Sequence, residues 1–225
     1  MTRVAAIVQA RMGSTRFPCK MLADLCGYPV FQWVIERCKR AGSLTEVVIA
    51  TTTSPADDDL ASLARKFGVM VFRGSEEDVL GRFIETAETF NLDVVVRVCA
   101  DNPLVAPEEI DRLVHFYLRH LPAYAFNHIP RWGNNYPDGL GAEILSAVLL
   151  KQIGQSSLVQ KHREHVTSYL WEHAYSFDMQ TFPCPAPYNQ PEMKLDIDTP
   201  EDLSFMAEVC ETLSFTSSPE EILNR

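Results

Sequence analysis

A loop rich in cations and hydroxyl groups follows the first apolar segment of the chain. It reads Gln9-Ala10-Arg11-Met12-Gly13-Ser14-Thr15-Arg16-Phe17-Pro18-Cys19-Lys20. Arg11, Arg16 and Lys20 can make charge-assisted hydrogen bonds to an anion, and backbone N–H groups in a loop of this kind can form an anion-binding concavity. The loop therefore predicts a binding site for a small anionic ligand.

The spacing within this loop excludes two common phosphate-binding motifs. It contains no G-x-x-x-x-G-K-[ST] sequence, and Gly13 is its only glycine, so a G-x-G-x-x-G fingerprint is absent as well. Hydrolysis of ATP at a P-loop and hydride transfer from a dinucleotide are therefore not the chemistry that this loop indicates.

Two carboxylates follow apolar segments and are candidates for a metal ion. Asp101 lies just beyond the apolar segment 93–99, and Asp198 ends a short segment in which Asp196 and Asp198 point to one face if the chain is extended. Mg²⁺ prefers few protein carboxylates together with phosphate oxygens and water. Asp101 and Asp198 are therefore candidates to hold Mg²⁺ on the phosphates of a nucleotide, the alternative being that each caps a neighbouring turn or helix.

Other clusters have simpler interpretations. The run Asp57-Asp58-Asp59 is typical of a first helical turn, where acids complement the helix dipole. The sequence from His162 to His165 lacks the H-E-x-x-H spacing of a zinc site. The aromatic loop around Trp132 is able to stack on a sugar ring, or to act as a lid or subunit contact.

The elements that must position these residues alternate between strand and helix over the first 120 residues. Apolar runs predict strands at 4–9, 46–51, 69–72 and 93–99, and helical periodicity predicts helices at 29–39, 56–67, 76–90 and 107–118. This alternation implies parallel βαβ units with a sheet covered on both faces, and ligands bind such sheets at the carboxyl ends of the strands.

The second half of the chain is less regular. We predict a long loop over 127–141, a helix over 159–173, a strand over 175–182 and a strand end at 194–198. The last main helix begins with Thr199 as N-cap, Pro200 at the first helical position and Asp202 at the third.

Composition bounds the class of protein. The 225 residues are 46% hydrophobic and 22% charged, as expected for one globular domain, and no apolar run reaches the roughly 20 residues of a membrane helix. The net charge of −10 argues against a general nucleic-acid or anionic-membrane binder, although the first 23 residues hold four basic residues and no acid. Six cysteines without C-x-x-C spacing predict free thiols, with Cys99 buried, and a cytoplasmic protein without a signal peptide.

The loop from Ala10 to Lys20 resembles the N-terminal signature of the cytidylyltransferases that activate acidic sugars. The pattern is closest to the spore-coat polysaccharide biosynthesis protein F group, which is related to the CMP-3-deoxy-manno-octulosonate and CMP-sialate synthetases. Further motifs that carry the resemblance follow in the expected order, at 95–104, 136–140, 163–167 and 195–203. Two positions depart from the pattern: Cys19 stands where the family usually has glycine, and Gly141-Ala142 stands where an aspartate usually precedes the next acidic position.

The resemblance implies a fold and a reaction. The fold would be an α/β three-layer sandwich with a mostly parallel central sheet, Rossmann-like and similar to nucleotide-diphospho-sugar transferases, forming one domain over residues 1–225. Residues 120–180 would form a subregion for acceptor binding and dimerisation. The reaction would transfer a cytidylyl group from CTP to an acidic sugar or related acceptor, with Mg²⁺ as cofactor and release of pyrophosphate, in a homodimer that makes surface polysaccharide.

The resemblance also assigns roles to individual residues. Arg11, Arg16 and Lys20 would act in catalysis by binding the triphosphate and stabilising charge on the leaving pyrophosphate. Asp101 and Asp198 would bind the metal. The nucleotide would contact Ala10, Arg11, Gly13, Ser14, Arg16 and Lys20, and the acceptor would contact Asp138, Glu143 and His165. Two alternatives stay open: a glycosyltransferase of related fold that consumes a nucleotide sugar, and a nucleotide-binding protein without catalysis.

Overall fold

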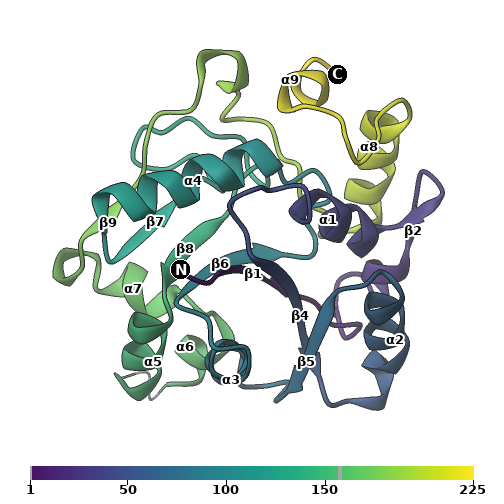
Figure 1. Ribbon diagram of the computed structural model, residues 1–225. Helices are drawn as coiled ribbons and strands as arrows, with labels where there is room; N and C mark the ends of the chain where they lie inside the picture. Colours follow the sequence, from purple (N-terminus) through teal and green to yellow (C-terminus); the bar gives the residue numbers. More distant parts are fainter. Residues whose placement is uncertain (1, 157–158) are drawn as a thin grey trace.

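A seven-stranded sheet forms the centre of the computed structural model, which describes residues 2–156 and 159–225 (Figure 1). The strand order is β5-β4-β1-β6-β8-β7-β9. Neighbouring strands run parallel except that β8 is antiparallel to both β6 and β7. The strands are β1 (Val4–Gln9), β4 (Glu46–Thr52), β5 (Met70–Gly74), β6 (Val94–Cys99), β7 (Tyr124–Phe126), β8 (Glu143–Ser146) and β9 (Met179–Gln180).

Helices cover both faces of this sheet, which confirms the three-layer α/β architecture (Figure 1). Because successive side chains of a strand point to opposite faces, Ala6 and Val8 of β1 enter one core cluster, and Ala5 and Ile7 enter the other. The first cluster packs against α1 (Val30–Cys38), α2 (Asp58–Lys66) and α4 (Pro107–His120); the second packs against α3 (Val79–Thr89), α5 (Ala147–Ser156) and α7 (Ser168–Glu172).

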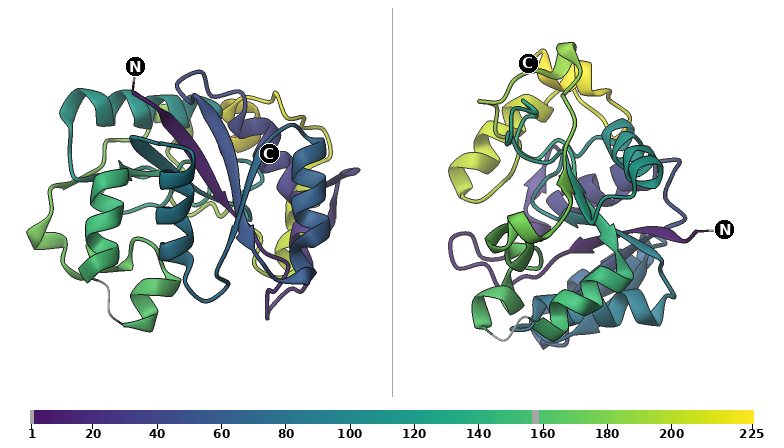
Figure 2. Two further views of the ribbon diagram at one scale, coloured as in Figure 1. Left: turned by 60° about the horizontal axis from the view of Figure 1, so that its bottom comes forward. Right: turned by 90° about the vertical axis from the view of Figure 1, so that its left-hand side faces the viewer.

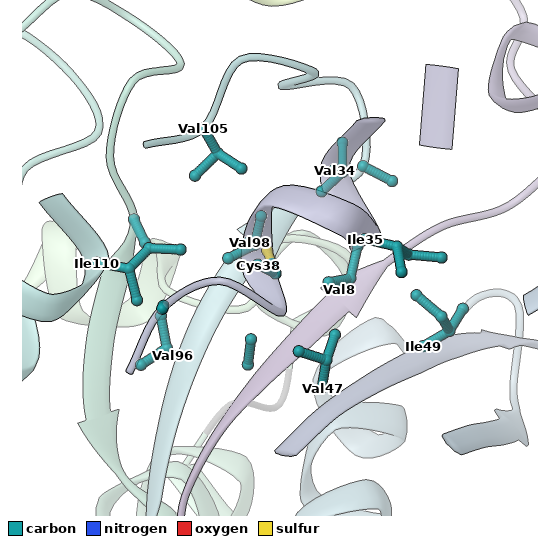
Figure 3. Packing of buried hydrophobic residues seen from close by; sticks show 14 of the residues in the cluster. Val8, Val34, Ile35, Cys38, Val47, Ile49, Val96, Val98, Val105 and Ile110 are labelled. Atoms are coloured by element: carbon teal, nitrogen blue, oxygen red, sulfur yellow. The ribbon is translucent and has the colours of Figure 1, made fainter. Parts of the chain in front are cut away.

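Figure 3 shows the first cluster from close by, with Val8 and Val98 of the sheet facing Val34 and Ile35 of α1. These side chains are buried, and β1 has an apolar side chain at five of its six positions. Such a continuous apolar run is typical of a parallel strand buried on both faces. The ends of β1 and β6 are therefore rigid supports for the loops that follow them.

A third cluster closes one end of the molecule. The β2–β3 hairpin (Asp24–Leu25 and Tyr28–Pro29), α8 (Pro200–Cys210) and α9 (Pro219–Leu223) gather around Trp33 and Met206. Figure 2 shows the C-terminal segment that contains α8 and α9 in yellow. Leu195 and Ile197 are buried in the same cluster, and the backbone N–H of Ile197 donates to the carbonyl oxygen of Asp101 at 2.8 Å. The segment that precedes α8 is thereby fixed beside the end of β6.

Most predicted elements of the first 120 residues are confirmed to within a few residues. The start of α8 is also confirmed: Thr199 and Asp202 form a reciprocal capping box with Pro200 in the first turn. The six cysteines are free thiols, and Cys99 is only partly buried because it lies in the wall of the cleft described below. Among the described residues, no helix is long and apolar enough to cross a membrane.

Three predicted elements of the second half were wrong. The segment 159–173 is not one helix but two, α6 (Gln160–Glu164) and α7, because His165 has extended backbone angles that end the first helix. The segment 175–182 contributes only the two residues of β9, and 194–198 forms only an isolated bridge between Lys194 and Asp138. The strands β7 and β8 and the helices α5 and α9 were not predicted.

Candidate active site

A cleft of about 320 Å³ opens at the carboxyl ends of β1 and β6. It lies between the loop 10–20 and the break between α6 and α7, where His165 contributes to its lining. This is the edge of the sheet at which the sequence predicts a ligand. The residues of the cleft that carry a predicted role are Ala10, Arg11, Gly13, Ser14, Arg16 and Lys20 for the nucleotide, Asp101 and Asp198 for the metal, and His165 for the acceptor.

Lys20 joins the two predicted metal ligands. Its ammonium Nζ lies 2.9 Å from Oδ2 of Asp101 and 3.5 Å from Oδ1 of Asp198, and it donates to the carbonyl oxygen of Ile197 at 2.7 Å. The residue is 8% exposed. Arg16 reaches the same Oδ1 of Asp198 at 3.0 Å. The two carboxylates can therefore share a single cation, although they are 81 and 178 residues away from Lys20 in the sequence.

Neither Asp101 nor Asp198 acts as the helix cap that was their alternative role. The cap of α8 is Thr199, whose side chain accepts a hydrogen bond from the backbone N–H of Asp202. The carboxylates of Asp101 and Asp198 are instead paired with Lys20 and Arg16. Both are about a quarter exposed, at 28% and 24%, so they remain accessible from the cleft.

Asp57 fixes the start of the basic loop. Its buried carboxylate accepts hydrogen bonds from the backbone N–H of Met12 at 2.8 Å and from the N–H and hydroxyl of Thr52. The run of three aspartates is the start of α2, as predicted, with Asp58 and Asp59 in its first turn. Asp57 has the additional role of holding the loop against the end of β4, which the sequence did not reveal.

Cys19 adopts the left-handed backbone conformation that its place in the loop demands. Its φ is 61° and its ψ is 16°, and its backbone N–H donates to the carbonyl oxygen of Met12 at 3.2 Å. Glycine adopts this conformation without strain, which accounts for the glycine that the family usually has there. Lys20 begins the 3₁₀ turn that follows, so the conformation of Cys19 sets the direction from which Lys20 enters the cleft.

A second pair of carboxylates lies near the first. Burial raises the pKa of Asp138 to about 6, and the neighbouring Asp196, Asp101 and Asp198 contribute to this shift. Burial also raises the pKa of Asp196, partly offset by Lys194. Within the described part of the chain, Oδ1 of Asp196 is buried without a hydrogen-bond partner. This part of the site therefore holds more negative charge than its own cations balance.

The three predicted acceptor residues lie in different surroundings. His165 lines the cleft. Asp138 is half-buried beside Lys194, to which its backbone is paired; it is not part of the cleft lining, but its charge interacts with those of Asp101 and Asp198. Glu143 is 1% exposed and lies behind the cleft, where it forms an ion pair with Arg97 and accepts hydrogen bonds from the hydroxyls of Tyr124 and Thr167. A direct contact between Glu143 and an acceptor therefore does not fit the structure.

No zinc site forms at the paired histidines. His162 is held by Glu172, with 2.6 Å between Nε2 and Oε2, and packs against Tyr169, while His165 faces the cleft. Residues 2–156 and 159–225 contain no group of three or more His, Cys, Asp or Glu side chains placed to hold a metal ion. A metal at Asp101 and Asp198 would thus need further ligands from a substrate or water, which suits Mg²⁺.

Comparison with known proteins decides the family. The family model described as "Cytidylyltransferase" matches residues 5–222. The chain belongs to the cytidylyltransferase family. It is 34% identical over 207 residues to "Spore coat polysaccharide biosynthesis protein SpsF" of Bacillus subtilis, a match that covers 90% of this chain and 84% of the relative.

Solved structures agree with this cytidylyltransferase assignment. A cytidylyltransferase from Leptospira borgpetersenii superposes with a TM-score of 0.92 and 29% identity, covering 100% of this chain and 93% of the other. CMP:2-keto-3-deoxy-manno-octonic acid synthetase, solved in complex with CTP, has the same fold with a TM-score of 0.73 and 19% identity, covering 94% of this chain and 100% of the other. The protein is a nucleotidyltransferase, which favours nucleotidyl transfer over the glycosyltransferase and non-catalytic alternatives.

Arg97 is the residue of the cleft that sequence reasoning missed. It lines the cleft from β6, two residues before the end of that strand. In the sequence it is a single charge inside the apolar run Val94–Cys99, and it belongs to the motif 95–104, but it received no predicted role. A charged residue at a central position of a strand that is otherwise buried requires a buried partner or an opening to solvent. Arg97 has both, with Glu143 as its partner.

Proposed function

We propose that this cytidylyltransferase transfers the cytidylyl group of CTP to an acidic sugar, releasing pyrophosphate, in the biosynthesis of a surface polysaccharide. The observation that carries the proposal is the contact of Lys20 Nζ with both Asp101 and Asp198 in a cleft that also exposes Arg11 and Arg16. The solved relative that contains CTP and the relative that takes part in spore-coat polysaccharide biosynthesis support the choice of nucleotide and pathway.

Positioning and charge neutralisation are the main requirements of nucleotidyl transfer. The hydroxyl of the acceptor attacks the α-phosphorus of CTP, and the bond to the pyrophosphate oxygen breaks. Arg11, Arg16 and Lys20 approach from the loop, where they bind the triphosphate and stabilise the negative charge that develops on the pyrophosphate. Ser14 and the backbone of the loop, with Ala10 and Gly13, surround the nucleotide.

The carboxylates of Asp101 and Asp198 fit a divalent cation. They already contact one cationic nitrogen, and the nearby Asp196 oxygen that has no partner among the described residues supports a demand for additional positive charge. Mg²⁺ bound by Asp101 and Asp198 would neutralise phosphate charge and orient the α-phosphate. With the cation in place, Lys20 would contact phosphate oxygens of the nucleotide in place of the carboxylates.

A pyrophosphate-release screen tests the function. Purified protein is assayed with each of the four common nucleoside triphosphates against a panel of acidic sugars, with MgCl₂ or EDTA. We expect release with CTP and at least one acidic sugar, and only with the divalent cation. Release of a nucleoside diphosphate from a nucleotide sugar, without pyrophosphate release in any combination, would show that the glycosyltransferase alternative is right.

The variant Asp198→Asn tests the metal site. We expect turnover to be abolished while the circular dichroism spectrum is retained, because Thr199 rather than Asp198 caps α8. Asp178→Asn is the matched control, since the exposed carboxylate of Asp178 contacts only the side chain of Gln180 among the described residues. Loss of folded structure in Asp198→Asn would assign Asp198 a structural role instead.

We further infer that residues 120–180 form the acceptor-binding and dimerisation subregion of a single domain and that the protein is a cytoplasmic homodimer. The loop 127–141 presents an exposed Trp132, and Tyr175 is fully exposed at the same groove of about 580 Å³. Exposed aromatic side chains of this kind are enriched at protein interfaces. Sedimentation of wild type as a dimer and of Trp132→Glu as a monomer is expected; a monomeric wild type would disprove the dimer.

A further inference from the structure

Arg97 presents a fixed guanidinium group to the cleft. Its side chain is 16% exposed, and it lines the cleft together with Cys99 and His165. One terminal nitrogen, Nη1, pairs with Oε2 of Glu143, whereas Nε is buried without a partner in the described part of the chain. Arginine carries five N–H donors in a rigid fork. Among the described residues no group accepts a hydrogen bond from the other terminal nitrogen, Nη2, so its donors are available to a ligand in the cleft, whereas the buried Nε is not.

Glu143 holds this guanidinium from behind. Its Oε2 takes the ion pair, and its Oε1 accepts hydrogen bonds from Tyr124 at 2.5 Å and Thr167 at 2.8 Å. Burial by itself raises the pKa of Glu143, but Arg97 and the surrounding donors lower it to about 2. The carboxylate is therefore ionised throughout the physiological range. A carboxylate held by three donors cannot move, so Arg97 is held in one orientation as well.

Two sets of residues line the cleft, and we call each set one half of it. The half formed by the loop after β1 contains Arg11, Arg16 and Lys20 together with the metal carboxylates. The half formed by β6 and the α6–α7 break contains Arg97 and His165. Glu143 of β8 holds Arg97, and Tyr124 of β7 and Thr167 hold Glu143 in turn. All three residues belong to the subregion 120–180.

We propose that Arg97 binds the carboxylate of the acceptor, and that Glu143 is the positioning residue that holds Arg97 for this contact. The proposal rests on the proposed function, in which two anionic substrates meet in one cleft. The triphosphate requires the cations and the metal of the first half. The second substrate then takes the second half, where a rigid guanidinium offers the charge-assisted N–H donors of Nη2 to a carboxylate.

The charge balance favours a carboxylate over a phosphate. Arg97 and Glu143 together are neutral. His128, 4.0 Å from Glu143, adds no charge near neutral pH because burial lowers its pKa. A phosphate monoester carries close to two negative charges at neutral pH and would lack the necessary cations, whereas a carboxylate carries one.

The test separates binding of the two substrates. Calorimetry measures the binding of CTP and, in separate experiments, the binding of acceptor probes. Two probes are acids, 3-deoxy-manno-octulosonate and N-acetylneuraminate, and each is compared with its methyl ester. Glycerol 3-phosphate is the third probe. The variants are Arg97→Met, Tyr124→Phe and the double variant Arg97→Met with Glu143→Gln. Exposed Arg119 provides the matched control Arg119→Met. The double variant avoids a buried unpaired carboxylate, because glutamine still accepts from Tyr124 and Thr167.

Wild type and Arg119→Met are expected to bind at least one probe acid and to bind its ester roughly 10- to 100-fold more weakly. Arg97→Met and the double variant should bind acid and ester equally, with the CTP dissociation constant changed by less than about threefold. Tyr124→Phe should weaken acid binding alone, by a few-fold. In turnover assays the loss should fall on the KM of the acceptor rather than that of CTP.

Several results would overturn the assignment. The first is that wild type binds acid and ester equally or binds neither, and the second is that wild type prefers glycerol 3-phosphate. The third is that the double variant loses CTP binding, which would place Arg97 in the nucleotide site. Failure of the proposed function has a different signature. In that case, wild type discriminates acid from ester through Arg97 but releases no pyrophosphate from CTP with any acceptor.

Discussion

Replacing Lys20 with methionine removes the one cation that contacts both Asp101 and Asp198 within the described part of the chain. Methionine keeps most of the apolar length of the side chain but removes the contacts of 2.9 Å and 3.5 Å to the carboxylates and the hydrogen bond to the carbonyl of Ile197. The two carboxylates are then left close together, and the charge of Asp138 lies close enough to respond to both. The variant should therefore be less stable, in a manner that depends on charge.

The size of the loss follows from the distances. At an effective dielectric constant of about 20, Coulomb attraction at these two distances is roughly 5 to 6 kcal/mol each. Desolvation of the buried ammonium offsets much of this attraction, and the carboxylates are about a quarter exposed, so we expect a net loss of roughly 2–3 kcal/mol. For a domain of this size, such a loss lowers Tm by roughly 4–12 °C.

Thermal unfolding with and without MgCl₂ measures this effect. Melting curves of wild type, Lys20→Met and the exposed control Lys151→Met are recorded by circular dichroism at matched ionic strength. Mg²⁺ should raise Tm more in Lys20→Met than in wild type, because the divalent cation replaces the missing charge between the same carboxylates. Turnover of Lys20→Met should fall by roughly 10²- to 10³-fold, comparable to the loss of one transition-state contact.

Three outcomes would refute parts of this reasoning. A wild-type Tm in Lys20→Met would mean that the contacts of Lys20 contribute nothing net to folding. An equal response of all three proteins to Mg²⁺ would mean that the cation does not bind between Asp101 and Asp198. Unchanged kinetics would remove Lys20 from the mechanism.

Three further changes have defined expectations. Cys19→Gly should raise the free energy of unfolding by roughly 0.5–1 kcal/mol in urea denaturation, because the strain relieved at φ 61° is worth more free energy than the entropy that glycine adds to the unfolded chain. A free energy of unfolding below that of wild type would contradict this. Gly141→Ala should lower the free energy of unfolding by roughly 2 kcal/mol or more, since a Cβ there would overlap the backbone carbonyl oxygen of Asn127; a neutral result would show that the loop can shift. Asp138→Asn should raise Tm at pH 7.5 but not at pH 4. Because the pKa of Asp138 in the folded protein, about 6, exceeds its ordinary value of 3.8, ionisation between these values destabilises the fold, and the amide removes that effect; equal shifts at both pH values would exclude this titration.

The first half of the fold could be predicted from the sequence because its signals are local. The strands of the parallel part are mostly apolar, as in Val94–Cys99 with Arg97 as its single charge. The helices α2, α3 and α4 have a side-chain cap or first-turn acids, such as Glu108 and Glu109 in α4. The strands β7 and β8 have only three and four residues, and they are strands because they pair with β6 and each other. Such pairing is a property of the tertiary structure and leaves little trace in a short segment.

The loop half of the site was predictable for the same reason, since its cations lie within ten residues. The spacing of Arg11, Arg16 and Lys20 is enough to indicate an anion site, and Asp101 and Asp198 are recognisable as carboxylates at segment ends. The role of Asp57, like that of Arg97, depends on partners far along the chain. The carboxylate of Asp57 accepts a hydrogen bond from the backbone N–H of Met12, 45 residues away, and no sequence pattern predicts a contact of this kind.

Glu143 shows how position changes the meaning of a side chain. In sequence it is an acid near the Asp138 motif, and an acceptor hydroxyl is a reasonable partner for it. In the sheet, β8 is antiparallel to β6 and places Glu143 directly opposite Arg97, so the register alone brings the two charges together. A buried carboxylate opposite a buried guanidinium is far more favourable as an ion pair than either charge alone. Because of this register, a ligand in the cleft contacts Arg97 rather than Glu143. Glu143 stabilises the charge of Arg97 and fixes the position of its guanidinium group.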